Sequence, residues 1–95
     1  MTQENATERR PAEAFHPSVF ICEEMEARGW DRWDLAHRMG GDPATNRLSI
    51  DLYLEVGPRE PNLLIGDGED FARAFGTSAE FWRNLETAWR GSKMQ

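Results

Sequence analysis

The side chains that most often carry metal chemistry are few and far apart in this sequence. His16 and His37 are the only histidines, and Cys22 is the only cysteine. A protein metal site needs ligands at short recurrent spacings, and neither histidine has a His or Cys partner at such a spacing. We therefore expect surface or helix-capping roles for both histidines, with no metal and no other cofactor.

The sequence also lacks the usual combinations of catalytic residues. It contains no glycine-rich phosphate loop and no nucleophile paired with a nearby base. Cys22 has no neighbouring basic group that would activate its thiol, so we expect a small, buried and unreactive side chain. These observations predict a protein that is not an enzyme.

Large aromatic residues are concentrated in this short chain. Four Trp and five Phe among 95 residues are enough to anchor a modest core. Trp is also enriched among the residues that dominate protein–protein contacts. We expect the region of Trp82 and Trp89 to be mainly core, and these two residues are our candidates for contact with a partner protein.

Length, charge and cysteine usage limit the classes of protein to which the chain can belong. The chain has room for one domain, and its net charge of -6 counts against tight nonspecific binding to nucleic acids. A single cysteine excludes an internal disulfide and fits a reducing compartment. No leader peptide and no membrane-spanning stretch is recognisable. We therefore expect a cytoplasmic protein without a membrane partner.

The chain divides into three parts on the basis of composition. Residues 1–14 are polar and lack periodicity, which predicts a disordered arm. Residues 15–91 form the predicted domain, and residues 92–95 form a short tail. Within the domain, Pro17 suits the first turn of a helix that ends near Arg28.

Two further helices are expected in the first half of the domain. Asp31 and Asp34 resemble a capping arrangement for a short helix that ends near Met39. Asp42 and Pro43 then begin a helix that extends to about Val56. Four residues of this helix recur every fourth position and form one apolar face: Ala44, Leu48, Leu52 and Val56.

The second half contains a turn and two more helices. Glycine and prolines predict a turn at 57–61, and residues 63–65 are expected to form a short extended piece. A hairpin between 48–56 and 63–65 is the alternative, because apolar residues also alternate in both segments. A helix over about 69–75 is followed by one for which Thr77 and Glu80 form a capping box. Its apolar stripe is Phe81, Leu85, Ala88 and Trp89, with Trp82 beside it.

Several stretches resemble a known family. The opening includes EEMEARGW at 23–30 and LAHRMG at 35–40, and the closing part includes ARAFGTSAEFWRNL at 72–85. Together they resemble the Xre-type regulators closest to HigA antitoxins over roughly residues 15–90. The resemblance implies an all-α, five-helix, lambda-repressor-like domain with a helix-turn-helix in its second and third helices.

The resemblance also implies a function and partners. Members of this family typically form homodimers, bind operator DNA and, in toxin–antitoxin pairs, hold an RNase toxin inactive. In such a unit the third helix enters the major groove. The residues expected to contact bases are Thr45, Asn46 and Arg47, and those expected to contact phosphates are Arg32 and Arg59.

The central segment differs from the family pattern. It is several residues longer than the family's turn and recognition helix, and at 48–56 it reads LSIDLYLEV, which is both apolar and acidic. Two hypotheses follow. The first is a dimeric DNA-binding transcriptional regulator that also neutralises a toxin. The second is an acidic protein-binding module, such as an inhibitor or anti-activator, on a helix-turn-helix scaffold that no longer reads DNA.

Overall fold

The computed structural model describes residues 15–66 and 68–93, and this part of the chain is an all-α domain. Its elements are α2 (Pro17–Arg28), α3 (Arg32–Arg38), α4 (Pro43–Glu55), the 3-10 turn η2 (Gly57–Arg59), α5 (Glu69–Phe75) and α6 (Ala79–Lys93). The predicted all-α class with five α-helices is confirmed. The predicted arm at 1–14 lies outside the described residues, and α6 continues two residues beyond the predicted domain end at 91.

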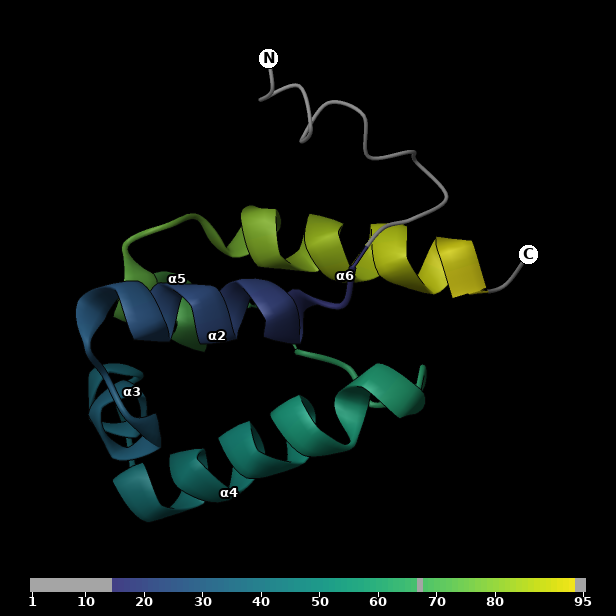
Figure 1. Cartoon of the computed structure of the whole chain (residues 1–95). Helices are drawn as coiled ribbons and strands as arrows, with labels where there is room; N and C mark the ends of the chain where they lie inside the picture. The colour runs from purple at the N-terminus through teal and green to yellow at the C-terminus, as the bar shows by residue number, and fades with distance from the viewer. Residues whose placement is uncertain (1–14, 67, 94–95) are drawn as a thin grey trace.

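The five helices form two groups (Figure 1). α3 packs mainly against α4, α5 packs against α6, and α2 lies along α6. α4 is on the opposite side of the molecule from α6 in this view. The α3–α4 pair thus forms one end and one side of the domain, with a short connection at 39–42 as in a helix-turn-helix.

Each of the first three helices is preceded by a side chain that accepts a hydrogen bond from a backbone N–H of the first turn. The His16 ring accepts a hydrogen bond from the Ser18 backbone N–H and caps α2. The predicted capping arrangement of Asp31 and Asp34 is confirmed, since each carboxylate accepts from the other residue's backbone N–H. Asp42 likewise caps α4 by accepting from the backbone N–H of Thr45.

The start of α6 differs from the prediction. Ser78, not Thr77, occupies the N-cap position, because its hydroxyl oxygen accepts from the backbone N–H of Phe81 at 3.1 Å. The Thr77 hydroxyl oxygen instead accepts from the indole N–H of Trp82 at 2.6 Å. The predicted capping box of Thr77 and Glu80 is therefore wrong by one residue, because the indole takes the hydroxyl that the sequence pattern assigned to the helix end.

The buried stripe of α6 also differs in part from the prediction. Trp82, Glu86 and Trp89 are buried, whereas Phe81 is exposed and lies edge-to-face with Phe20 and Trp82. The core around Trp82 contains the apolar residues that the other four helices turn inward, namely Ile21, Met25, Leu35, Ala36, Met39, Ile50, Tyr53, Phe71 and Phe75. The predicted stripe is thus confirmed for Leu85 and Trp89 and wrong for Phe81 and Ala88, which are exposed.

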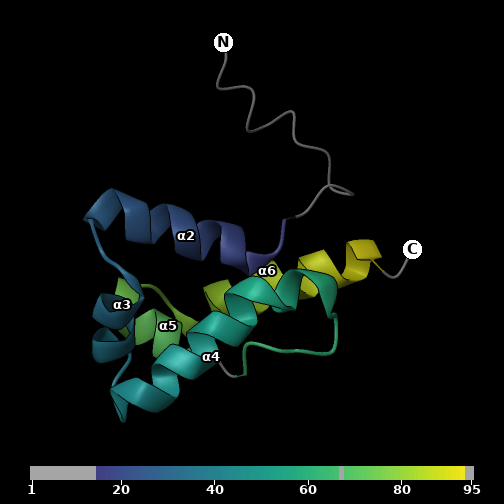
Figure 2. The same cartoon turned by 60° about the horizontal axis from the view of Figure 1, so that its bottom comes forward.

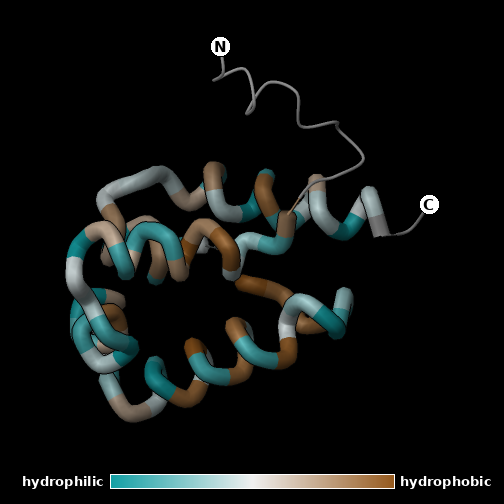
Figure 3. Tube along the Cα trace, viewed as in Figure 1, coloured by the Kyte–Doolittle hydropathy of each residue, from teal (hydrophilic) through white to brown (hydrophobic). Residues whose placement is uncertain are grey.

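The segment after α4 has no regular structure at 63–65. No strand occurs within residues 15–66 and 68–93, so the alternative hairpin is wrong. The backbone N–H of Ile65 is hydrogen-bonded to the carboxylate of Glu86 on α6, and this bond fixes the segment beside α4. Apolar residues recur along α4 and in this segment, as the brown colouring in Figure 3 shows.

Candidate interaction surface

α4 supplies the surface on which both hypotheses depend, and one side of it lies at the outside of the domain (Figure 2). Its inner side consists of Asn46, Ile50 and Tyr53, which are buried. These residues recur at the three- and four-residue spacing of a helix face, so the residues between them point outward or sideways. The outward side therefore includes two members of the predicted apolar face, Leu48 and Leu52.

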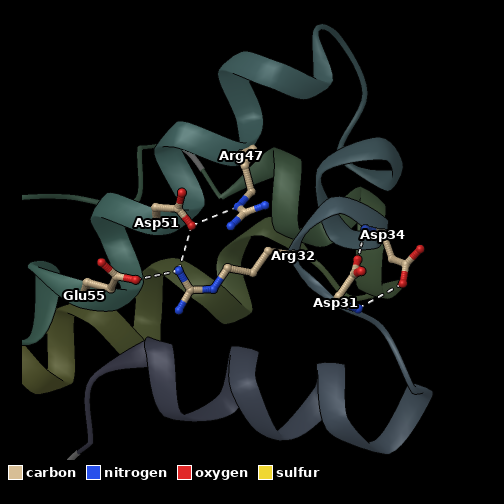
Figure 4. Close-up of polar contacts among 6 residues, drawn as sticks. All are labelled: Asp31, Arg32, Asp34, Arg47, Asp51 and Glu55. Atoms are coloured by element: carbon tan, nitrogen blue, oxygen red, sulfur yellow. Dashed lines mark hydrogen bonds and ion pairs between the residues drawn. The ribbon is translucent and has the colours of Figure 1, made fainter.

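The two arginines expected to contact DNA from α3 and α4 are both bound to acids of α4 (Figure 4). Arg32 Nη1 lies 2.7 Å from Asp51 Oδ1 and 2.8 Å from Glu55 Oε2. Arg47 Nε lies 3.0 Å from the same oxygen of Asp51. The hydrogen bonds from Arg32 and Arg47 lower the pKa of Asp51, and those to Asp51 and Glu55 raise the pKa of Arg32. Two positive and two negative charges thus offset each other within the domain.

Trp33 borders this ion network. The sequence did not indicate it as a candidate site residue. This residue is 45% exposed, and the Arg47 guanidinium carbon lies 5.2 Å from the centre of its ring. Helical spacing carried no signal for this position. Leu35 and Ala36 are the buried residues of α3, and Trp33, three residues before Ala36, lies on a neighbouring part of the same side of the helix.

The remaining candidates for DNA contact are not brought together. Thr45 is exposed, and its hydroxyl donates to Asp42 at 2.8 Å. Asn46 is buried, and its amide nitrogen donates to the carbonyl oxygens of Ala36 and Gly40. The amide of Asn46 thus joins α3 to α4 and has no donor left for a base. Arg59 is exposed in η2, at the opposite end of α4 from Arg47.

An apolar strip lies beside the ion network. We call Leu48, Leu52 and Leu64 the α4 strip; they are 71%, 49% and 51% exposed. Leu52 and Leu64 also line a groove of about 230 Å³ between α4, α5 and the 63–66 segment. Its other walls are Met39, Ser49, Tyr53, Leu63, Ile65, Gly66, Asp70 and Phe71. The surface therefore combines exposed leucines with a groove that has a mainly apolar lining.

The tryptophans predicted to contact a partner are part of the core. Trp82 and Trp89 are only 1% and 4% exposed. Trp82 packs against Phe71 and Phe75, and Trp89 packs edge-on against the His16 ring. Burial removes both indoles from the surface, so their assignment as partner-binding residues is at odds with the structure, and the exposed indole belongs to Trp33.

The histidine and cysteine expectations have different outcomes. His16 does cap a helix, but it is buried against Tyr53 and Trp89, and this burial lowers its pKa to about 4. His37 is exposed, as expected for a surface residue. Cys22 is exposed on α2, so the expectation of a buried thiol is wrong. The apolar positions of α2 are divided between two faces, and Cys22 is on the outer one.

This geometry can be set against known proteins. The chain matches no protein-family model, no curated protein and no solved structure. Within residues 15–66 and 68–93, no helix has both the length and the apolar character needed to cross a bilayer. In the same residues, no three His, Cys, Asp or Glu side chains gather into a group that could hold a metal ion.

Proposed function

We propose that the domain is a protein-binding module. It binds a partner protein through the outward side of α4 and acts by occupying a surface of that partner. The observation that supports this function is the pair of exposed leucines, Leu48 and Leu52, one turn apart on that helix. Complete burial of a leucine side chain contributes roughly 1.5–3 kcal/mol, so two leucines at the centre of an interface supply a substantial part of a binding free energy.

The ion network favours a protein over DNA as the ligand. A base-reading helix needs free donors aimed at the groove. Here Arg32 and Arg47 both donate to Asp51, so a carboxylate already offsets part of their positive charge. If this face met DNA, both arginines would bring that carboxylate with them. The carboxylates of Asp51 and Glu55 would then face phosphates, which is electrostatically unfavourable.

Site-specific photocrosslinking in cells tests this proposal. A photoreactive residue replaces Leu48 in the full chain, and a matched chain carries it at Val19, an exposed apolar position on α2. We expect position 48 to give protein adducts that position 19 does not give. Adding Leu52→Asp should abolish these adducts without changing the helical circular dichroism spectrum. Identical adduct patterns from positions 48 and 19 would refute the proposal.

A DNA-binding regulator of the HigA-like Xre group is the second candidate. The pairing of α3 with α4 through the short 39–42 connection supports it, as do the exposed side chains of Thr45 and Arg59. An electrophoretic shift with the DNA upstream of the gene discriminates between the candidates. A salt-sensitive complex weakened by Arg47→Glu supports this second candidate, whereas no complex at micromolar protein and low salt excludes it.

A further inference from the structure

We infer that the partner presents an amphipathic helix whose apolar stripe is flanked by Lys or Arg. This helix lies along the α4 strip and inserts an apolar side chain into the groove beside Leu52 and Leu64. The inference rests on the proposed protein-binding function and adds to it the shape and charge of the bound segment.

The spacing of the α4 strip favours a helix as the bound segment. Leu48 and Leu52 form a ridge one turn long, and residues 63–66 border the groove next to it. Rows of side chains four residues apart pack into the grooves of another helix. An extended peptide would instead need a strand edge for pairing, and the described part of the chain has no strand.

The groove supplies a place for an apolar anchor. Its volume of about 230 Å³ lies between aromatic and aliphatic side chains, including Tyr53, Ile65 and Phe71. Anchors of this kind, enclosed near the centre of an interface, dominate many protein–protein affinities. Because the wall at Ile65 is bonded to Glu86, the groove is held in place before a partner arrives.

The charges of the surface around the strip favour basic flanks. The described residues of 42–75 include three arginines and six carboxylates, which are Asp42, Asp51, Glu55, Glu60, Glu69 and Asp70. Asp70 lines the groove on one side of the strip and is paired with Arg73 at 3.1 Å. Asp51 and Glu55 follow α4 on the other side, where Arg32 and Arg47 pair with them. With Arg32 of α3 included, six carboxylates stand against four arginines, so the wider surface remains acidic. Lysines or arginines beside the partner's apolar stripe complement this charge.

Two other candidates for the segment bound to the α4 strip fit it less well. A second copy of this chain in a two-fold contact would place one acidic α4 surface against another, which is unfavourable. The segment 1–14 contains Met1 as its only large apolar residue, so its sequence offers no apolar stripe to cover the leucines.

Fluorescence anisotropy with three synthetic helical peptides tests the inference on the full chain. One peptide has a leucine stripe flanked by lysines, the second has glutamates in place of the lysines, and the third has serines in place of the leucines. We expect the first to bind at least about tenfold more tightly than either of the others. Leu52→Asp should abolish binding, and Asp70→Asn should weaken it about threefold. Val19→Asp, a matched exposed position on α2, should leave it unchanged.

Each contrary result separates this inference from the proposed function. Equal binding of the lysine and glutamate peptides, both lost in Leu52→Asp, overturns the basic partner but retains a protein-binding surface. Binding of the serine peptide, or binding that survives Leu52→Asp, shows nonspecific charge attraction and overturns the inference. A dimer in sedimentation that Leu52→Asp dissociates identifies a second copy as the occupant and overturns it as well. If no peptide binds while position 48 still gives protein adducts, only the inference fails.

Discussion

Asp51 determines how much positive charge the α3–α4 surface offers to a ligand. One of its oxygens accepts from both Arg32 and Arg47, which come from different helices. Its carboxylate therefore offsets part of the positive charge of both arginines. Its side chain is partly exposed, so solvent screens the pairs and their contribution to stability is small.

Asp51→Asn should therefore release the arginines more than it disturbs the fold. We expect the variant to elute from immobilised heparin at higher salt than the wild type, because two guanidinium groups lose their shared anion. Glu23→Gln removes the same charge from the exposed side of α2 and is the control. If both variants shift elution equally, net charge explains the effect and the arginines were not held by Asp51.

His16 gives the domain a sensitivity to acid. Its folded pKa of about 4 is below the ordinary value of 6.5, so the unfolded chain binds a proton first as the pH falls. The stabilisation from a neutral His16 is complete above pH 6.5 and is lost between 6.5 and about 4. Over that range the loss is roughly 3 kcal/mol.

The variant His16→Asn isolates this contribution, because Asn can still cap α2 but does not titrate. We expect the wild type to lose about 2 kcal/mol more than the variant between pH 7 and pH 5 in urea unfolding. His37→Asn, at an exposed position, should retain the wild-type pH dependence. Parallel stability profiles for the wild type and His16→Asn would contradict the assignment.

At the scale of elements, helix α6 shows what a local pattern can and cannot predict. The sequence correctly indicates a helix that begins just after Gly76, but Thr77 and Ser78 are chemically similar caps. The choice between them depends on Trp82, whose indole N–H needs an acceptor once the ring is buried. Capping preferences alone therefore cannot predict which of the two hydroxyls caps the helix.

Removal of either hydroxyl should have a separable effect on stability. Ser78→Ala loses the cap of α6 and should cost about 1 kcal/mol. Thr77→Val leaves the indole N–H without its partner and should cost about 1–2 kcal/mol, whereas Thr77→Ser keeps the hydroxyl and should cost less. Chemical unfolding measures all three variants. If Ser78→Ala leaves the free energy of unfolding unchanged, another group caps α6.

Helix α4 was predictable in extent but not in orientation. Asp42 and Pro43 indicate its start, and the apolar residues at a spacing of four indicate a helix. Leu48 and Leu52 then suggest a buried face, yet the core takes Asn46, Ile50 and Tyr53. The reason is tertiary, because the Asn46 amide bonds to two carbonyls of the α3 region and thereby turns the leucines outward.

At the scale of the whole molecule, Glu86 joins three separate parts of the domain. Its carboxylate on α6 accepts from the Tyr53 hydroxyl of α4 at 2.8 Å and from the Ile65 backbone N–H at 2.6 Å. Burial and the bond to Glu86 raise the pKa of Tyr53, so its hydroxyl stays protonated and continues to donate. Sequence reasoning missed this role, since a glutamate in the last helix looks like any solvated residue.

Glu86→Ala should loosen the domain around the groove. One buried and one partly buried donor lose their acceptor, and we expect a loss of about 2–4 kcal/mol in the free energy of unfolding. Glu86→Gln keeps a carbonyl oxygen as acceptor and should lose less. Hydrogen exchange at the Ile65 amide should accelerate in Glu86→Ala but not in Glu80→Gln, at an exposed position of the same helix. Unchanged exchange at Ile65 would show that other contacts hold the 63–66 segment.

The unequal environments of the four indoles give the domain an intrinsic optical probe. Trp82 and Trp89 are enclosed, Trp30 is partly covered by Arg28 and Arg38, and Trp33 is open to solvent. A neutral collisional quencher such as acrylamide will therefore reach Trp33 first. Emission from this one ring can report, without an added label, when a macromolecule covers α3 and α4.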